Sequence, residues 1–314
     1  MPTHEPPMDV LIIGTGVSGL IAAREIQRGG RSVLLLDKGR GLGGRLASRR
    51  IGAATFDHGA QFITTRDARF EKILKQGAQA GVMEEWCRGF SAAADGHPRW
   101  RGQSAMTAFA KYLAQGLEIR MEKQVVALRP TADRYAVETS TGDCYTAAAV
   151  LLTPPVPQSL ALLSAGEIEL DPAMRTRLES LQYERCLAVM AVLKAPSLIP
   201  PPGGLAPASG PVAWIADNQL KGISAEPAVT IHASHEFSLA HWDEDRMESG
   251  RLLLEASRPW MGPCVMKCSP SCAPVLAWQK RTATSSISIA AAKCCAACAS
   301  HSTASTAPVE PRWT

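Results

Sequence analysis

The stretch DVLIIGTGVSGLIAAREIQRGGRSVLLLD, residues 9–37, decides the fold. It begins with a continuous apolar run, residues 9–13, which is typical of a strand in a parallel sheet covered on both faces. Apolar residues at helical spacing follow and end at Gly29-Gly30, which predicts a helix with a glycine stop. A second apolar run then ends at Asp37. Residues 9–37 are therefore predicted to form one strand–helix–strand unit.

Three glycines between the first strand and the helix have the G-x-G-x-x-G spacing. Gly14 permits the tight turn, Gly16 lets a pyrophosphate approach the backbone, and Gly19 lets the helix lie close to the strand. The helix N-terminus offers free N–H groups to phosphates. Asp37 closes the second strand, where a carboxylate can accept ribose hydroxyls and disfavours a 2′-phosphate. The pattern predicts a dinucleotide site; the structural alternative is a glycine-rich helix turn beside a surface Asp.

A second glycine-rich loop, KGRGLGGR at 38–45, follows Asp37 directly. Gly43 and Gly44 let backbone pass close to a large ligand, and Arg45 can pair with phosphate charge. A simple NAD dehydrogenase has no need of such a loop, whereas an extended FAD does. The alternative is a mobile basic loop without a ligand.

Two further segments, FDHGAQFIT at 56–64 and VLLTPPVPQSL at 150–160, complete a pattern that resembles the flavin amine oxidases. Within that superfamily the chain is most similar to the bacterial renalase-like proteins, and IHASHEFS at 231–238 fits more weakly. The resemblance covers about residues 9–260. It implies an α/β protein: a glutathione-reductase-type, Rossmann-like FAD-binding domain interleaved with an α+β substrate domain.

The resemblance also implies roles for particular residues. Gly59, Ala60 and Gln61 would run past the isoalloxazine ring, and His58 is interpreted as a turn residue rather than a base. The full set of implied FAD contacts is Gly14, Gly16, Gly19, Asp37, Lys38, Gly43, Gly44, Arg45, Gly59, Ala60, Gln61, Val125 and Thr153.

In the second domain, His232 and Asn218 are the candidate catalytic residues. Trp214 and Trp242 are further candidates for a substrate wall. Each of these residues, taken alone, is also compatible with a purely structural role. The family's usual Lys-Pro-Gly after the Asn is here Lys221-Gly222-Ile223.

The activity implied by the resemblance is oxidation of dihydro isomers of NAD(P)H to NAD(P)⁺, with O₂ reduced to H₂O₂. A dihydropyridine becomes aromatic by losing hydride, so this reaction needs no side-chain base, and the flavin takes the hydride. An amine oxidase is the enzymatic alternative, although its facing aromatic pair is less expected where aromatics are 5% of residues. A non-catalytic flavoprotein fragment that lacks its FAD-capping segment is the alternative from another class.

Composition sets the remaining expectations. The chain has 314 residues, 46% hydrophobic and 20% charged, which indicates a soluble globular protein of about two domains. A net charge of +4 argues against a nucleic-acid or membrane-surface polycation. No export signal or membrane-length apolar run is recognised, so a cytoplasmic enzyme with a small-molecule substrate and no metal is expected. The expected FAD-binding domain is 1–60 with 101–160, and the substrate domain is 61–100 with 161–260.

Residues 262–314 have a different composition. Six of the nine cysteines fall there, and Glu310 is the only acidic residue. A zinc site is one interpretation, but Cys295 and Cys298 lack a second C-x-x-C at the usual spacing. A disordered tail is another. The favoured interpretation is a frameshift near residue 262, because the family's Gly-Asp strand end and following helix are missing, which would remove one wall of the FAD site.

Overall fold

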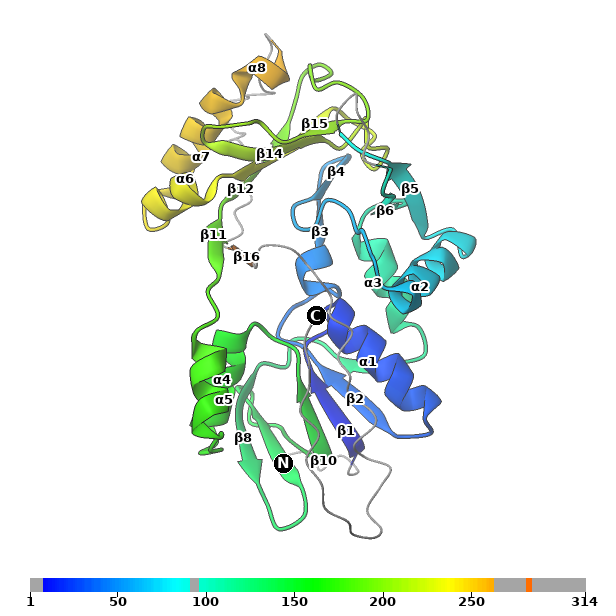
Figure 1. The fold of residues 1–314 in the computed structure, drawn as a ribbon, viewed down its shortest axis with the longest axis vertical. Helices are drawn as coiled ribbons and strands as arrows, with labels where there is room; N and C mark the ends of the chain where they lie inside the picture. The colour runs from blue at the N-terminus through cyan, green and yellow to red at the C-terminus, as the bar shows by residue number, and fades with distance from the viewer. Residues whose placement is uncertain (1–7, 91–95, 263–280, 284–314) are drawn as a thin grey trace.

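A computed structural model describes residues 8–90, 96–262 and 281–283 (Figure 1). Its larger sheet has six strands, parallel in the centre and antiparallel at one edge. The strand order is β7 (Glu118–Arg120), β2 (Val33–Leu36), β1 (Met8–Ile13), β10 (Cys144–Leu152), β9 (Tyr135–Thr139) and β8 (Val125–Pro130). The sheet confirms the predicted α/β class.

The predicted strand–helix–strand unit is present as β1, α1 (Val17–Arg28) and β2. Leu20 and Ala23 on α1 are fully buried against one face of the sheet, together with Ile12 and Leu35. Helices α2 (Ala68–Gln79) and α3 (Thr107–Ala114) complete this layer. The opposite face of the same strands packs on α4 (Val156–Ala165), followed by α5 (Pro172–Glu179). Burial on both faces explains the unbroken apolar runs in β1 and β2.

Strand β10 is longer than the sequence indicates. The apolar pattern predicts two short strands, 144–146 and 149–153, but the structure has one continuous strand from Cys144 to Leu152. Its first residues pair antiparallel with β9, while Ala147 and the residues after it pair parallel with β1. Tertiary pairing on both sides therefore carries the strand through an alanine stretch of low intrinsic β-propensity.

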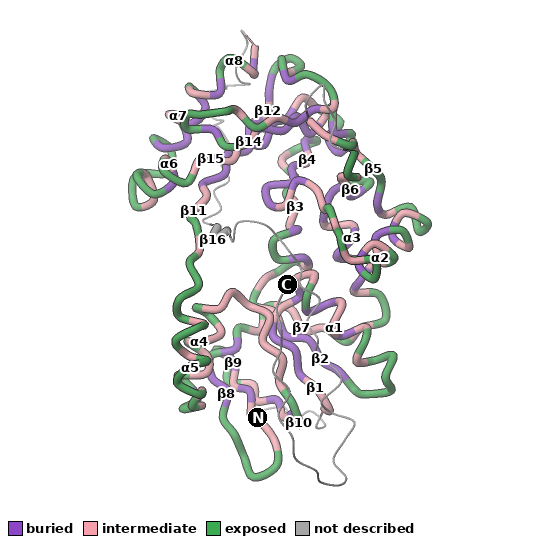
Figure 2. The backbone as a smooth tube through the Cα atoms, in the orientation of Figure 1, coloured by how far each residue is buried: buried purple, intermediate pink, exposed green. Residues whose placement is uncertain are grey.

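A second sheet is antiparallel and lies at the far end of the molecule from the six-stranded sheet (Figure 1). Its strand order is β12 (Ala188–Val192), β15 (Ala228–Ala233), β14 (Val212–Asp217) and β13 (Gly204–Leu205). One face packs Val189, Ile215 and Ile231 against α7 (Arg246–Ala256) and α8 (Arg258–Met261). Helix α6 (His235–Ala240) follows β15. Figure 2 shows buried positions along this sheet and along β1 and β2.

A hairpin lies between the two sheets (Figure 1). It consists of β3 (Ser48–Ile51) and β4 (Ala54–Asp57), preceded by the 3₁₀ turn η1 (Gly44–Leu46). Phe56 and Ala54 are buried against Met190 and Ala228 of the second sheet. A separate hairpin pairs β5 (Met83–Cys87) with β6 (Arg99–Gly102). The β3–β4 hairpin therefore links the glycine-rich loops to the second sheet.

The expectation of a disordered or frameshifted tail at 262–314 falls outside the described residues, except for Gly262 and a short strand. That strand, β16 (Arg281–Ala283), pairs with β11 (Glu184–Cys186). Within the part of the chain that the structure describes, no helix combines the length and apolar character needed to cross a membrane.

The β8–β9–β10 meander contains an acid-sensitive contact. Asp143 accepts hydrogen bonds from Lys123 Nζ at 2.7 Å and Thr141 Oγ1 at 2.5 Å, which lower the pKa of its carboxyl from 3.8 to about 2. Because the pKa of Asp143 is lower in the folded than in the unfolded chain, its ionised carboxylate stabilises the fold above about pH 4. This contribution is lost as the pH falls toward 2.

Asp143→Asn is therefore expected to lower the thermal midpoint at pH 6 and to have little effect at pH 2. Midpoints measured from pH 2 to pH 6 test this. Asp133→Asn is the control, since the Asp133 side chain is 80% exposed and its ion pair is a long one, 3.7 Å from Oδ2 to Arg134 Nε. A wild-type-minus-variant difference that stays constant over the whole range would contradict the assignment.

Candidate functional site

The G-x-G-x-x-G turn contains two glycines that the fold needs and one that it does not. Gly14 has φ +106°, and a Cβ there would lie 2.5 Å from Thr153 Oγ1. A Cβ on Gly19 would lie 2.0 Å from the Gly14 carbonyl oxygen. Gly16 is in extended conformation, with no atom within 4 Å of its Cβ position. The open space beside Gly16, at the start of α1, is where a ligand can approach the backbone.

Asp37 is fixed at the end of β2. Its Oδ2 accepts from the Thr15 N–H at 2.7 Å and Thr15 Oγ1 at 2.8 Å, and its Oδ1 accepts from the Gly39 N–H at 2.7 Å. A carboxylate has about four acceptor positions, so one is left for a ligand hydroxyl. The carboxylate therefore both ties the two glycine-rich loops together and presents one acceptor.

The second glycine-rich loop lies directly beside the first. Gly43 donates its N–H to the Thr15 carbonyl at 3.0 Å and forms a parallel bridge with Gly16. A Cβ on Gly44, whose φ is +52°, would lie 3.6 Å from Gly16 Cα. The two loops form one surface of closely spaced backbone, which we call the cradle: Gly14–Gly16, Asp37 and Gly43–Arg45.

Three more of the expected FAD contacts surround this surface. Thr153 donates its hydroxyl to the Ile13 carbonyl at 2.8 Å and lies against Gly14. Lys38 is exposed, and its Nζ donates to Gln158 Oε1 at 3.1 Å. Val125 is 8% exposed and begins β8, the strand that follows the loop held by Asp37 through the Lys123 N–H. Residues predicted from the sequence as FAD contacts, from five separate segments of the chain, therefore lie in or around the cradle.

The segment 58–61 leads from the cradle to the second sheet. Ala60 donates its N–H to the Arg45 carbonyl at 2.9 Å. The Gln61 side chain, 6% exposed, donates Nε2–H to the carbonyls of Asp57 and Gly59, while its Oε1 has no hydrogen-bond partner among the described residues. The His58 carbonyl lies 3.2 Å from His232 Nε2. Since a carbonyl only accepts, His232 Nε2 carries a proton in this contact.

His232 and Trp214 lie opposite each other on adjacent strands of the second sheet, so they share a face. This face is turned toward the β3–β4 hairpin. Rings of Phe62, Trp86 and Phe90 gather there, with centroid distances of 4.8 Å from Phe90 to Trp214 and 4.9 Å from Phe90 to Trp86. The arrangement gives an aromatic wall beside an imidazole.

The other two candidates lie elsewhere. Asn218 is fully buried, and its Nδ2 donates to Thr230 Oγ1 at 3.0 Å, so it holds the turn between β14 and β15. Its Oδ1 has no partner within the described chain. Trp242 packs with the apolar cluster on the opposite face of the sheet and lies under the guanidinium of Arg185, 4.9 Å away.

A fully buried ion pair lies at the base of the aromatic wall. Lys221 Nζ is 2.7 Å from Asp57 Oδ2, and both side chains are 0% exposed. Burial lowers the pKa of the Lys221 ammonium, an effect that Asp57 opposes. Asp57 lies in the FDHGAQFIT segment, and Lys221 is the first residue of the Lys221-Gly222-Ile223 stretch. Neither the pair nor the ring cluster was predicted, because their members lie far apart in the chain.

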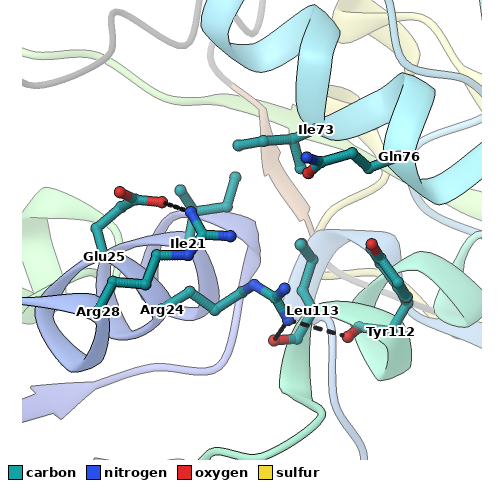
Figure 3. A pocket seen from close by; sticks show the side chains of 8 residues that line it. All are labelled: Ile21, Arg24, Glu25, Arg28, Ile73, Gln76, Tyr112 and Leu113. Atoms are coloured by element: carbon teal, nitrogen blue, oxygen red, sulfur yellow. Dashed lines mark hydrogen bonds and ion pairs between the residues drawn. The ribbon is translucent and has the colours of Figure 1, made fainter.

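A shallow pocket between α1, α2 and α3 is not part of this site (Figure 3). Arg24 fills one side of it and donates to the Leu113 carbonyl at 3.3 Å, at the end of α3. The volume of this pocket, about 10 Å³, is room for about one water molecule. It is a gap between packed helices and carries no chemistry.

The geometry of the cradle fits an extended dinucleotide such as FAD. No protein atom lies within 4 Å of the Cβ position of Gly16, which leaves open space where a pyrophosphate could approach, and Asp37 keeps one acceptor for a ribose hydroxyl. The unpartnered Gln61 Oε1 is a buried acceptor between the cradle and the aromatic wall, where a ligand donor would satisfy it. The described residues contain no cluster of His, Cys, Asp or Glu suited to a metal ion.

Comparisons with known proteins agree with this geometry. Residues 12–76 match the NAD(P)-binding Rossmann-like domain, and residues 90–197 match the flavin-containing amine oxidoreductases. Renalase of Mus musculus is 23% identical over 269 residues, 78% of both chains. The L-amino acid dehydrogenase of a Synechocystis species is 36% identical over 69 residues, 22% of this chain and 15% of that protein.

Solved structures give the same fold. A triple mutant of putrescine oxidase superposes with a TM-score of 0.61 at 15% identity, covering 87% of this chain and 84% of that chain. At this identity the likeness concerns the fold alone.

Proposed function

Because the chain is a flavin-dependent oxidoreductase related to the flavin-containing amine oxidoreductases, we propose that it binds FAD and oxidises dihydronicotinamide nucleotides with O₂ as electron acceptor. The observation that carries the choice of substrate is the similarity to a renalase along 78% of both chains. The match to an amino acid dehydrogenase, in contrast, is confined to 22% of the chain.

The cradle would hold the dinucleotide. The first N–H groups of α1 would face the pyrophosphate, where the positive end of the helix dipole favours anionic groups. Asp37 would accept a ribose hydroxyl, and Val125 would lie near the adenine. Bound FAD supplies a hydride acceptor at its N5.

The aromatic wall suits a planar substrate ring. Trp214 would pack against a dihydropyridine through its π face. His232 donates Nε2–H to the His58 carbonyl in the present contact, so that atom orients backbone rather than removing a proton. A dihydropyridine loses hydride directly on becoming aromatic, which is consistent with a wall that lacks a base at that atom.

Rapid mixing of the FAD-loaded chain with 2- or 6-dihydro isomers of NAD(P)H is expected to bleach the flavin faster than mixing with any primary amine. In air, one H₂O₂ should form for each NAD(P)⁺. Bleaching by amines alone would favour an amine oxidase, the activity that the match over residues 90–197 makes the second candidate. A colourless, folded protein would leave only the non-catalytic alternative.

A further inference from the structure

We propose that Lys221 is a positioning residue: its buried ion pair with Asp57 holds the segment 58–61 in place between the cradle and the aromatic wall. The proposal extends the flavin-dependent function proposed above and rests on it for the kinetic part of its test. The supporting observations are the contacts at each end of the pair.

Asp57 is held by groups on the side of the molecule that contains the cradle. Its Oδ1 accepts from Ser48 Oγ at 2.6 Å and from the Met106 N–H at 2.9 Å, while its Oδ2 accepts from Lys221. These partners come from the β3–β4 hairpin, the start of α3 and the second sheet. One carboxylate therefore joins three parts of the fold.

The Lys221 end is anchored in the second sheet. Its N–H donates to the Asp217 carbonyl at 2.9 Å, and Asp217 Oδ1 accepts from the Gln219 and Leu220 N–H groups at 2.8 and 2.9 Å. The turn after β14 is thus rigidly hydrogen-bonded. Lys221 Nζ also lies 5.0 Å from the centre of the Trp86 ring, so the ammonium contacts the aromatic wall directly.

The segment that follows Asp57 is held partly by one of its own side chains, because Gln61 Nε2 donates to the Asp57 and Gly59 carbonyls. After Asp57, it is held at the His58 carbonyl by His232 and at the Ala60 N–H by the Arg45 carbonyl. The ion pair fixes the residue immediately before the first of these contacts. A displaced Asp57 would move the His58 carbonyl, the Gln61 side chain and the backbone facing the cradle together.

Burial of both charges makes this an unusual way to stabilise a fold. Two charges taken out of water lose hydration that their attraction only partly offsets, and apolar residues of similar volume often stabilise a core equally well. The same low-dielectric surroundings strengthen the attraction between the two charges and so fix the position of one side chain relative to the other. Arg101 is the other cation that acts on Lys221, and it is paired with Glu84 at 2.9 Å.

The test uses the full FAD-loaded chain with Lys221→Met, Lys221→Arg and the double variant Asp57→Asn/Lys221→Met. All three are expected to retain bound FAD, because the Gly16 and Asp37 positions proposed for the pyrophosphate and ribose are separate from the pair. Each should show a displaced flavin absorption maximum and a changed flavin fluorescence. With dihydronicotinamide isomers, the limiting bleaching rate should fall about tenfold to a hundredfold with an unchanged half-saturating concentration. Of the three variants, Lys221→Arg should show the smallest fall in the limiting bleaching rate.

Lys75→Met is the matched control, because it removes the same side chain from an exposed 2.7 Å ion pair with Glu71. It should leave spectrum and rate unchanged. If Lys221→Met does not fold, Lys221→Arg and the uncharged double variant carry the test. Folded variants with a wild-type spectrum and rate would overturn the proposal. A wild-type protein that dihydronicotinamides do not reduce would defeat the proposed function instead, while the spectral and fluorescence shifts still decide the role of Lys221.

Discussion

Gly16→Val is expected to abolish measurable flavin binding while leaving the fold intact. Gly16 has φ −70° and ψ 173°, which any residue adopts, and its Cβ position has no neighbour within 4 Å. A side chain at this position would therefore begin in open space and occupy the region proposed for the pyrophosphate. Loss of the phosphate contacts at the start of α1 removes the charge-assisted hydrogen bonds of the cradle, each worth about 1.5–3 kcal/mol.

Absorbance of the purified protein and flavin titration followed by fluorescence test this result. The thermal midpoint of Gly16→Val should equal that of the flavin-free wild type. Gly19→Ala is the informative contrast, because its Cβ would lie 2.0 Å from the Gly14 carbonyl oxygen and force α1 away from β1. That variant should lose both flavin and stability. Full flavin occupancy in Gly16→Val would place the pyrophosphate elsewhere.

Asp37→Ala is expected to weaken flavin binding at least about tenfold, and more where the loops also shift. The substitution removes the proposed ribose acceptor and the three hydrogen bonds that Thr15 and Gly39 donate to the carboxylate. The two glycine-rich loops would then lose a shared support. Dissociation constants measured by fluorescence titration give the effect directly.

Asp9→Ala is the control for Asp37→Ala. Asp9 also accepts from a backbone N–H and a hydroxyl, both of Ser32 at 2.8 Å, but it lies at the opposite end of β1. The Asp9→Ala substitution should lower the stability of the fold slightly and leave flavin affinity unchanged. Equal losses of affinity in both variants would show that strand pairing, and not the carboxylate at the cradle, controls binding.

The sequence predicted the strand–helix–strand unit beneath the cradle because the signals of that unit are local. Gly14, Gly16 and Gly19 lie within six residues, and the apolar runs on either side identify the strands and helix that place them. The recognised α/β class and the relation to flavin oxidoreductases follow from that unit and the loop at 38–45. Local patterns are sufficient there because the ligand would contact backbone more than side chains.

The site between the sheets was much less predictable. Asp57 and Lys221 are separated by 164 positions, and neither residue type nor spacing indicates that they meet. His232 and Trp214 share a face only through the register of β14 and β15, which contains an irregularity between Val212 and Trp214. The β10 boundaries were wrong for the same reason: the strand depends on partners that local propensity does not represent.

The pairing of β1 with β10 has a consequence for synthesis of the chain. β1 leaves the ribosome before the other strands of the described residues, yet one of its two neighbours, from Ala147 to Leu152, is translated about 140 residues later. At about 5–20 residues per second, one edge of this very apolar strand stays unpaired for roughly 7–28 seconds. During that interval β1 resembles an aggregation-prone edge strand. Transient exposure of this strand edge in the nascent N-terminal half is therefore imposed by topology, independent of how stable the finished sheet is.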